Sequence, residues 1–309
     1  MPTQHVVAAL DVPRVHRVGI GTSSVLFDYW ELTKPEITFL VTITTGTGFW
    51  MGTAAALPQF PWMPFLESLL GTALVASGAA TLNQLIELPY DARMRRTARR
   101  PIASGRIARS HALWFGVALS VLGVAFLAIS TNALAALLAA LTLLSYLFLY
   151  TPLKRITPLC TLVGAIPGAA PPLIGWAAAR GRLDPTAWGL FAMVFLWQFP
   201  HFTPIAWMYR EDYARAGFLI LPSGENRDRL VIWQPVTASA VLLVVALLPA
   251  IGRLSGAAYL VAAFVLGGIL LLYSTRFGIH RTNVAARQLV LVSILYLPAI
   301  FALLVLNKK

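Results

Sequence analysis

The chain has 309 residues, of which 58% are hydrophobic and 12% are charged, and its formal net charge is +12. This composition excludes an ordinary water-soluble domain, whose exterior must be covered by charged and polar side chains. Lipid is the solvent that suits so apolar a surface. The positive charge does not indicate nucleic-acid binding, because the basic residues lie in short clusters between apolar runs. The single cysteine, Cys160, cannot form an intrachain disulfide.

Apolar runs along the chain predict an all-α, polytopic membrane protein. A helix needs about twenty apolar residues to cross the hydrocarbon of a bilayer. Runs of about that length occupy residues 37–55, 67–88, 110–130, 133–150, 157–178, 186–208, 231–252, 255–275 and 288–306. We therefore expect about nine transmembrane helices around a central cavity, forming one domain over residues 35–309. Residues 1–34 lack the apolar core of a secretory signal and are expected to be a cytoplasmic N-terminal tail.

The distribution of basic residues predicts the orientation of these helices. With nine crossings, 19 of the 24 lysines and arginines fall in the N-terminal segment and in the loops on its side of the membrane. Cytoplasmic loops carry an excess of Lys and Arg, so the N-terminus is expected in the cytoplasm. The second and sixth helices then both end at the cytoplasmic face.

The second predicted helix ends in a polar cluster. Asn83, Glu87 and Asp91 are four residues apart, so a helix stacks their oxygens along one face. Oxygen ligands suit Mg²⁺, which commonly bridges carboxylates to substrate phosphates, and the arginines of residues 93–100 can bind the same anion. Alternatively, these acids are interfacial and merely neutralised by the arginines. An acid and an asparagine within the last turns of an apolar membrane helix cost free energy unless they face a polar cavity. This favours a functional role.

The sixth predicted helix carries a second polar cluster. At about 100° per residue, Asp212 returns to within about 20° of the face of His201, whereas Glu211 points about 80° aside. This geometry favours Asp212 over Glu211 as an inward ligand, and it places Trp197 about 40° from His201. His201 is expected roughly 16 Å deeper than Asp212. It either contacts substrate or only satisfies a neighbouring carbonyl.

Two further segments lie between these clusters. Tyr150 and Lys154 end the fourth predicted helix, where such residues usually serve as interfacial anchors. The stretch from Gly164 to Trp176 is rich in small residues and prolines. It predicts close helix packing and interrupted hydrogen-bond ladders around a cavity.

Taken together, these motifs resemble the protohaem IX farnesyltransferases (haem O synthases), within the superfamily of membrane-embedded aromatic prenyltransferases. The superfamily motif, Asn-x3-Asp-x3-Asp, is matched by Asn83, Glu87 and Asp91, with glutamate in place of the first aspartate. Segments similar to the haem branch are Met94-x-Arg96-Thr97-x2-Arg100-Pro101, Tyr150 to Arg155, the small-residue run through Trp176, Trp197-Gln198-x-Pro200-His201-Phe202 and Asp212-Tyr213-x-Arg215-Ala216-Gly217. The resemblance covers residues 30–305, but no acid stands four residues after Asp212.

This resemblance implies a reaction and a site. Farnesyl diphosphate, protohaem IX and water would give haem O and diphosphate, with Mg²⁺ as the metal and haem as a substrate rather than a cofactor. The metal ligands would be Asn83, Glu87, Asp91 and Asp212, which with Lys154 form the expected catalytic set. The expected substrate-binding residues are Arg93, Arg96, Arg100, Tyr150, Lys154, Trp197, His201 and Glu211. The protein would be multi-pass in the inner membrane, its site open to the cytoplasmic face, with a haem-processing membrane enzyme as a candidate partner.

Other functions are less consistent with these residues. A quinone precursor or another ring is an alternative acceptor, although the segments Met94 to Pro101 and Pro200 to Phe202 favour haem. A secondary transporter would place polar residues near the bilayer midplane, whereas these acids lie at helix ends. A structural assembly factor would need no acid clusters.

Overall fold

The computed structural model describes residues 25–54, 57–221 and 224–309, which form helices and contain no strand. The helices of the N-terminal half are α1 (Val25–Leu32), α2 (Pro35–Gly52), η1 (Leu57–Gln59), α3 (Trp62–Ile86), α4 (Leu88–Asp91), α5 (Arg109–Ser130), α6 (Ala133–Leu144), η2 (Ser145–Tyr150) and α7 (Thr151–Leu153). Those of the C-terminal half are α8 (Cys160–Ala169), α9 (Pro171–Arg180), α10 (Pro185–Met208), α11 (Arg210–Ala216), α12 (Glu225–Ile251), α13 (Ala257–His280) and α14 (Asn283–Leu306). The prediction of an all-α chain is confirmed.

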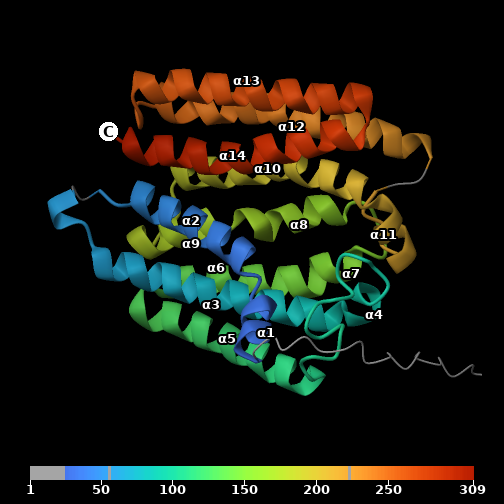
Figure 1. Cartoon of the computed structure of the whole chain (residues 1–309). Coiled ribbons are helices and arrows are strands. Elements are labelled where there is room, and N and C mark those ends of the chain that lie inside the picture. Colours follow the sequence, from blue (N-terminus) through green and yellow to red (C-terminus); the bar gives the residue numbers. More distant parts are fainter. Residues whose placement is uncertain (1–24, 55–56, 222–223) are drawn as a thin grey trace, which may run out of the picture.

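The long helices lie side by side (Figure 1), and their contacts form a closed series. In chain order, α2 packs on α3, α3 on α5, α5 on α6, and α6 on both α8 and α9. Helix α10 packs on α8 and α12, α12 on α13, α13 on α14, and α14 returns to α2. Contacts of α2 with α9 and of α10 with α14 join helices that are far apart in the sequence. The polar ends of α3 and α10 therefore belong to one bundle.

Much of the outer surface is apolar. Seven helical segments in the described part of the chain are long and apolar enough to cross a membrane: Trp62–Ile86, Arg109–Ser130, Ala133–Leu153, Cys160–Arg180, Asp228–Ile251, Ala257–His280 and Asn283–Leu306. Large apolar side chains such as Leu122, Phe264 and Leu295 are exposed on these segments. Lipid is a solvent in which such exposure costs little. Helices α2 and α10 lie where two more crossings are predicted, but they are not among these seven segments. Helix α2 contains several threonines, and α10 contains Pro, Gln and His. The total of nine crossings remains a prediction.

Helices α2 and α9 approach each other closely. A Cβ atom added to Gly48 would lie 2.1 Å from the carbonyl oxygen of Pro172, and one added to Gly175 would lie 1.9 Å from that of Thr45. No side chain fits in either place, so the two backbones touch only because these positions are glycine. The close packing predicted for residues 164–176 is confirmed.

Two predicted helices are interrupted rather than straight. The fourth runs as α6, then as the π-helical η2, and ends in α7, where the Thr151 hydroxyl donates to the carbonyl of Tyr146 at 2.9 Å. The fifth breaks at Ala170 because Pro171 and Pro172 supply no backbone N–H to continue the hydrogen-bond ladder of α8. π-helical turns often occur at functional sites. Here η2 leads directly to Tyr150 and Lys154.

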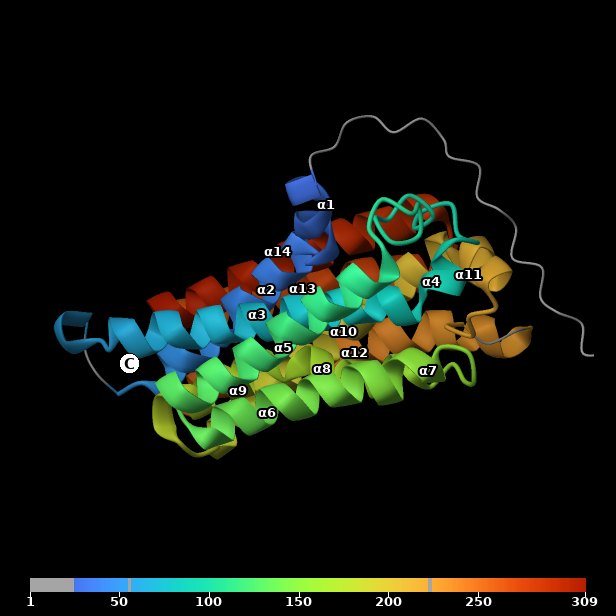
Figure 2. The same ribbon diagram turned by 90° about the horizontal axis from the view of Figure 1, so that it is seen from below.

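The segment expected as an N-terminal tail contains helix α1, while residues 1–24 lie outside the described residues. Figure 2 shows α1 and the teal loop after α4 projecting on the same side of the bundle. Arg106 in that loop pairs with Asp28 of α1 and, at 2.8 Å, with Glu31. Leu32 packs in a buried cluster with Ile102 of the same loop. Helix α1 is therefore docked on the bundle.

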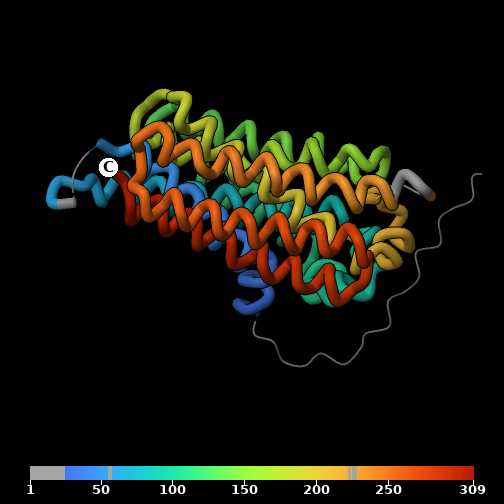
Figure 3. The backbone as a smooth tube through the Cα atoms, turned by 90° about the horizontal axis from the view of Figure 1, so that it is seen from above, coloured from blue at the N-terminus to red at the C-terminus, as the bar shows by residue number. Residues whose placement is uncertain are grey.

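Basic side chains cap the far end of α2. The amine of Lys308 donates to the carbonyl of Trp50 at 2.6 Å and to that of Thr53, and Arg180 donates to the carbonyl of Gly52. Figure 3 shows the C-terminus beside the chain that leaves α2. These cations donate to carbonyls that have no partner within the helix at its C-terminus, and they lie at the negative end of the helix dipole. The end of the bundle opposite α4 and α11 is thereby tied together.

Candidate active site

The first polar cluster lies where α3 passes into α4. The N–H of Glu87 donates to the carbonyl of Asn83, and the N–H of Asp91 donates to the carbonyl of Glu87. Both N···O distances are 2.9 Å. Helical hydrogen bonding therefore continues past Ile86, where α3 ends, and the three side chains keep one face. All three side chains are buried. Pro89 lies in the first turn of α4, where its missing N–H is tolerated.

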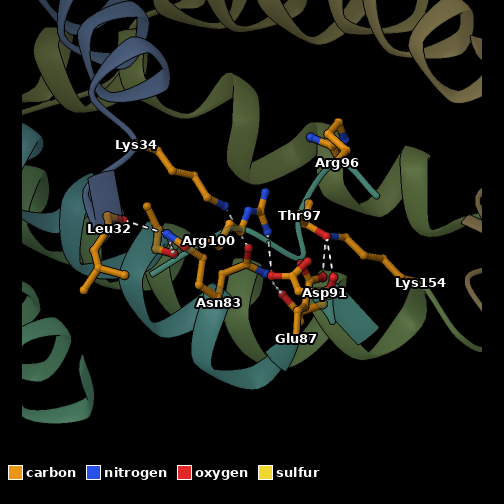
Figure 4. Close-up of polar contacts among 12 residues, drawn as sticks. Leu32, Lys34, Asn83, Glu87, Asp91, Arg96, Thr97, Arg100 and Lys154 are labelled. Atoms are coloured by element: carbon orange, nitrogen blue, oxygen red, sulfur yellow. Dashed lines mark hydrogen bonds and ion pairs between the residues drawn. The ribbon is translucent and has the colours of Figure 1, made fainter. Parts of the chain in front are cut away.

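Basic side chains from separate elements hold the two carboxylates (Figure 4). The amine of Lys154, which follows α7, donates to Glu87 Oε1 at 2.6 Å. The guanidinium of Arg100, in the loop after α4, donates to Asp91 Oδ2 at 2.7 Å. The Lys154 amine also lies 4.4 Å from the centre of the Tyr150 ring, a cation–π distance. The structure thus brings these expected residues to the acids.

The pair of Glu87 and Lys154 is charged although it is buried. Burial raises the pKa of the Glu87 carboxyl, but the charge and hydrogen bond of Lys154 outweigh this, so the pKa lies below its ordinary value. Burial lowers the pKa of Lys154, but Tyr150 and Glu87 more than reverse this, so the pKa lies well above its ordinary value. Removing one partner of such a pair leaves the other charge buried, at a cost of about 3–5 kcal/mol.

Lys34 is a site residue that the sequence analysis did not place. It lies between α1 and α2 in the left-handed region, with φ 47°, and its amine donates to Asn83 Oδ1 at 3.1 Å. The Asn83 amide in turn donates to the hydroxyl of Thr151 at 3.1 Å. Although Lys34 as a whole is half-buried, desolvation of its amine and the positive charge of Arg100 lower its pKa to about 7. In the sequence, Lys34 stands only as a lysine before Pro35, just ahead of the first predicted helix, and this position alone does not indicate a contact with Asn83.

One carboxylate oxygen of the cluster is unsatisfied. Asp91 Oδ1 is buried and has no hydrogen-bond partner among the described residues, a costly state that a bound cation would relieve. The oxygens of Asn83, Glu87 and Asp91 are of the type that Mg²⁺ prefers, so the residues fit this ion. Among the described residues, no three His, Cys, Asp or Glu side chains converge as a metal site, so Asp212 does not complete such a group. A Mg²⁺ ion here would take further oxygens from substrate phosphate or water.

The second cluster lies just beyond α10. A break at Tyr209, with φ −103° and ψ 17°, separates α10 from α11, so no single regular helix carries both His201 and Asp212. Asp212 is buried and pairs with Arg215, whereas the Glu211 side chain is 88% exposed. This burial follows the expected preference for Asp212. A pocket of about 430 Å³ is lined by Arg95, Arg96, Met208, Tyr209, Glu211, Asp212 and Arg215.

The two clusters lie at the same end of the bundle, where Figure 1 shows α4, α7 and α11. The loop after α4 packs on the segment after α10, because Met94 shares a buried cluster with Ala216 and Phe218. The Arg96 guanidinium also lies 3.5 Å from the hydroxyl of Tyr213. The common end predicted for the second and sixth helices is therefore observed.

The expected arginines differ in their contacts. Arg100 reaches an acid and Arg96 reaches α11, but Arg93 is exposed and forms no ion pair with another described residue. The N–H of Leu219 donates to the carbonyl of Lys154 at 2.6 Å, which joins the segment after α11 to the end of α7. Three loops therefore meet around the buried carboxylates.

His201 and Trp197 lie deeper, on α10. Their rings stack, with centroids 4.8 Å apart and planes at 15°. Both contact Ser293 of α14: the indole N–H of Trp197 donates to its carbonyl at 2.7 Å, and His201 Nδ1 lies 2.9 Å from its Oγ. The structure brings these two expected residues together but not to the carboxylates.

With this geometry in view, the similarity of the chain to known proteins is informative. Residues 40–304 match the UbiA prenyltransferase family. The chain belongs to this family. As a member it is a prenyltransferase, and its membrane-spanning helices fit a location in a membrane. The protoheme IX farnesyltransferase of Solibacter usitatus is 49% identical, over 91% of this chain and 98% of that protein. The protoheme IX farnesyltransferase of Koribacter versatilis is 44% identical, over 93% of this chain and 95% of that protein.

Several solved structures share the fold. Digeranylgeranylglyceryl phosphate synthase superposes with a TM-score of 0.74 at 15% identity, over 91% of this chain and 98% of that one. A UbiA homologue from Archaeoglobus fulgidus bound to GPP and Mg²⁺ superposes with a TM-score of 0.61 at 18% identity, over 90% and 99%. At such identities the likeness concerns the fold alone.

Proposed function

We propose that this chain transfers a farnesyl group from farnesyl diphosphate to a vinyl group of protohaem IX, with addition of water, giving haem O and diphosphate. The relatives that are 49% and 44% identical over nearly its whole length are protoheme IX farnesyltransferases. One observation carries the proposal for the site. Asn83, Glu87 and Asp91 are buried among lysine and arginine side chains, and Asp91 Oδ1 has no partner among the described residues. Such a mixture suits a diphosphate with its counter-cation.

Mg²⁺ is the proposed cofactor. Asn83, Glu87 and Asp91 would hold it, Asp91 through the free Oδ1, and Asp212 would hold a second ion. When bound, the ion supplies positive charge to the diphosphate. The Archaeoglobus fulgidus homologue bound to GPP and Mg²⁺ is consistent with this choice.

The basic residues assist departure of the diphosphate. Lys34, Lys154 and Arg100 donate hydrogen bonds to Asn83, Glu87 and Asp91, and they are proposed to turn these donors toward phosphate oxygens when substrate binds. The bond between the allylic carbon and oxygen then breaks, and its electron pair leaves with the diphosphate. Donors fixed where negative charge develops lower the barrier to this step. The exposed arginines Arg93 and Arg96 are proposed to attract the anion.

The acceptor completes the reaction. The face of Tyr150 is proposed to stabilise the allylic cation. The terminal vinyl carbon of haem bonds to the first farnesyl carbon, which leaves a cation on the inner vinyl carbon. Water adds to that carbon and loses a proton, so the product carries a hydroxyl group. Trp197 and His201 are proposed to contact the haem, and Glu211 to line the entrance.

The location and surroundings are also proposed. The excess of basic residues at the end bearing α4 and α11 supports a site that opens to the cytoplasmic face of the inner membrane, with the N-terminal tail on that side. The product is a modified haem, so a haem-processing membrane enzyme is the proposed partner.

The proposal is tested by incubating the purified protein with Mg²⁺, farnesyl diphosphate and either haem or a hydroxylated aromatic ring. Mass spectrometry should find the farnesylated product only with haem, and a chelator should prevent its formation. Farnesylation of the aromatic ring in place of haem would support the alternative acceptor and refute the proposal.

A further inference from the structure

The hydrogen bonds around His201 determine where its ring proton lies. The hydroxyl of Ser293 lies 2.7 Å from the carbonyl oxygen of Val290, which can only accept a hydrogen bond. A serine hydroxyl has one proton, and that proton is directed to Val290. The contact of 2.9 Å between Ser293 Oγ and His201 Nδ1 must then be donated by the ring. Nδ1 therefore carries a proton, and in the neutral imidazole Nε2 then carries the lone pair.

Within the described part of the chain, no side chain or backbone group pairs with His201 Nε2. The Nδ1 contact is the one hydrogen bond of His201 among the described residues, and the residue is half-buried rather than enclosed. Its ring is held on two sides, because it stacks on Trp197 and presents an edge contact to Phe202. The Trp197 indole is itself fixed to the backbone of Ser293. The described residues therefore orient the Nε2 edge of the imidazole without pairing it.

We propose that His201 Nε2 is an axial ligand to the iron of the haem acceptor, and that Ser293 is a positioning residue for it. This rests on the proposed function. Neutral imidazole is a common ligand of haem iron, and a ligating histidine usually donates its other N–H to a fixed acceptor. Ser293 supplies that acceptor.

This assignment also places the haem. His201 lies seven residues before Met208, the last residue of α10, which corresponds to about 10 Å along the helix. The carboxylates that receive the diphosphate lie at that same end of the bundle. Iron held at His201 would place the haem about 10 Å along the bundle from the end that carries the carboxylates.

The test compares two tetrapyrroles that differ only in iron. Purified full-length protein is titrated with ferric haem, followed by absorbance and electron paramagnetic resonance, and with metal-free protoporphyrin IX, followed by fluorescence. His201→Ala should lower haem affinity by more than about tenfold, the least that is typical of losing even a partner that only supports a ligand, and should remove the spectral signature of a histidine ligand. Affinity for metal-free protoporphyrin should not change. His280→Ala, at an exposed histidine at the end of α13, is the matched control and should behave like wild type.

Two further variants separate ligation from packing. Added imidazole should restore the histidine-type spectrum of His201→Ala. Ser293→Ala should weaken haem binding by up to about tenfold, and Ser293→Thr, which keeps a hydroxyl, should recover it. The inference is overturned if His201→Ala keeps the wild-type haem spectrum. It is also overturned if this variant loses haem and metal-free protoporphyrin equally.

The outcome is independent of catalysis. Wild-type protein that shows a histidine-ligated haem but forms no haem O would refute the proposed function and leave the ligand assignment standing. Formation of haem O without a histidine-ligated complex would refute the ligand assignment alone.

Discussion

Asp91 is held by Arg100 through one oxygen, while its other oxygen has no partner among the described residues. We predict that Asp91→Asn, which removes the negative charge but keeps the shape, lowers kcat by about a hundredfold, the scale of lost electrostatic stabilisation. Steady-state formation of haem O measures this. Asp184→Asn is the control, because Asp184 forms only partly exposed pairs with Arg180 and Arg182. Wild-type turnover in Asp91→Asn would show that the cluster is merely interfacial.

Lys34 predicts a pH dependence of substrate binding. Its pKa is lowered to about 7, so the amine is largely neutral above that pH and charged below it. A bound diphosphate favours the ammonium, so binding above about pH 7 must take up a proton. Affinity for farnesyl diphosphate should therefore fall as the pH rises above about 7, by up to about tenfold per unit, with no such change below it.

Calorimetry in buffers of different ionisation enthalpy would detect this proton uptake. Lys34→Arg stays charged at all these pH values and should remove both the uptake and the pH dependence. An unchanged pH profile in Lys34→Arg would exclude Lys34 as the titrating group.

The sequence predicted the carboxylates of the site better than their partners. Asn83, Glu87 and Asp91 follow helical spacing within one segment, so local geometry alone aligns them. Lys34 reaches Asn83 across 49 residues and Lys154 reaches Glu87 across 67, and such pairings depend on tertiary packing. Lys154 was expected through family resemblance, whereas Lys34 was not.

At the scale of elements, the contact between α1 and the loop after α4 supports the site, because that loop also carries Arg100. Arg106 pairs with Asp28 and Glu31 and donates to the carbonyl of Arg99 at 2.8 Å. We predict that Arg106→Ala lowers the free energy of unfolding by about 1–3 kcal/mol, since hydrogen bonds to charged groups are lost.

Arg106→Ala should also speed tryptic cleavage of this loop in detergent solution. Arg182→Ala, a largely exposed arginine at the other end of the bundle, should change neither quantity. Equal protease resistance of Arg106→Ala and wild type would contradict the role given to this contact.

The long helices lie where the apolar runs predict them, with ends that differ by up to six residues, because apolar length is a local property. Helix α1 was missed because its eight residues are too few for a membrane crossing and it is held by distant contacts. The π-helical η2 and the break at Ala170 were not placed either. A π-helical turn such as η2 leaves no clear pattern in the apolar residues of the sequence. The break at Ala170 was expected only in general, from the prolines of that stretch.

For the whole molecule, the arrangement predicts that the loops after α4 and α10 face the same side of the membrane. Cys160 is the single cysteine of the chain, so a Cys160→Ser background allows single cysteines to be introduced for labelling. Ser104→Cys and Ala214→Cys, both at exposed positions, should react with an impermeant maleimide from the cytoplasmic face. Arg182→Cys should react from the other face. Labelling of the first two from opposite faces would separate the clusters and refute a shared site.

The central claim is that diphosphate departs at the buried carboxylates and that haem receives both the farnesyl group and water. The most direct measurement is the mass of the tetrapyrrole formed when purified protein, Mg²⁺, farnesyl diphosphate and haem react in ¹⁸O-labelled water. We predict a single product that has gained one farnesyl group and one ¹⁸O-labelled hydroxyl group. Haem that stays unreacted, or a farnesylated haem without the labelled oxygen, would contradict the account.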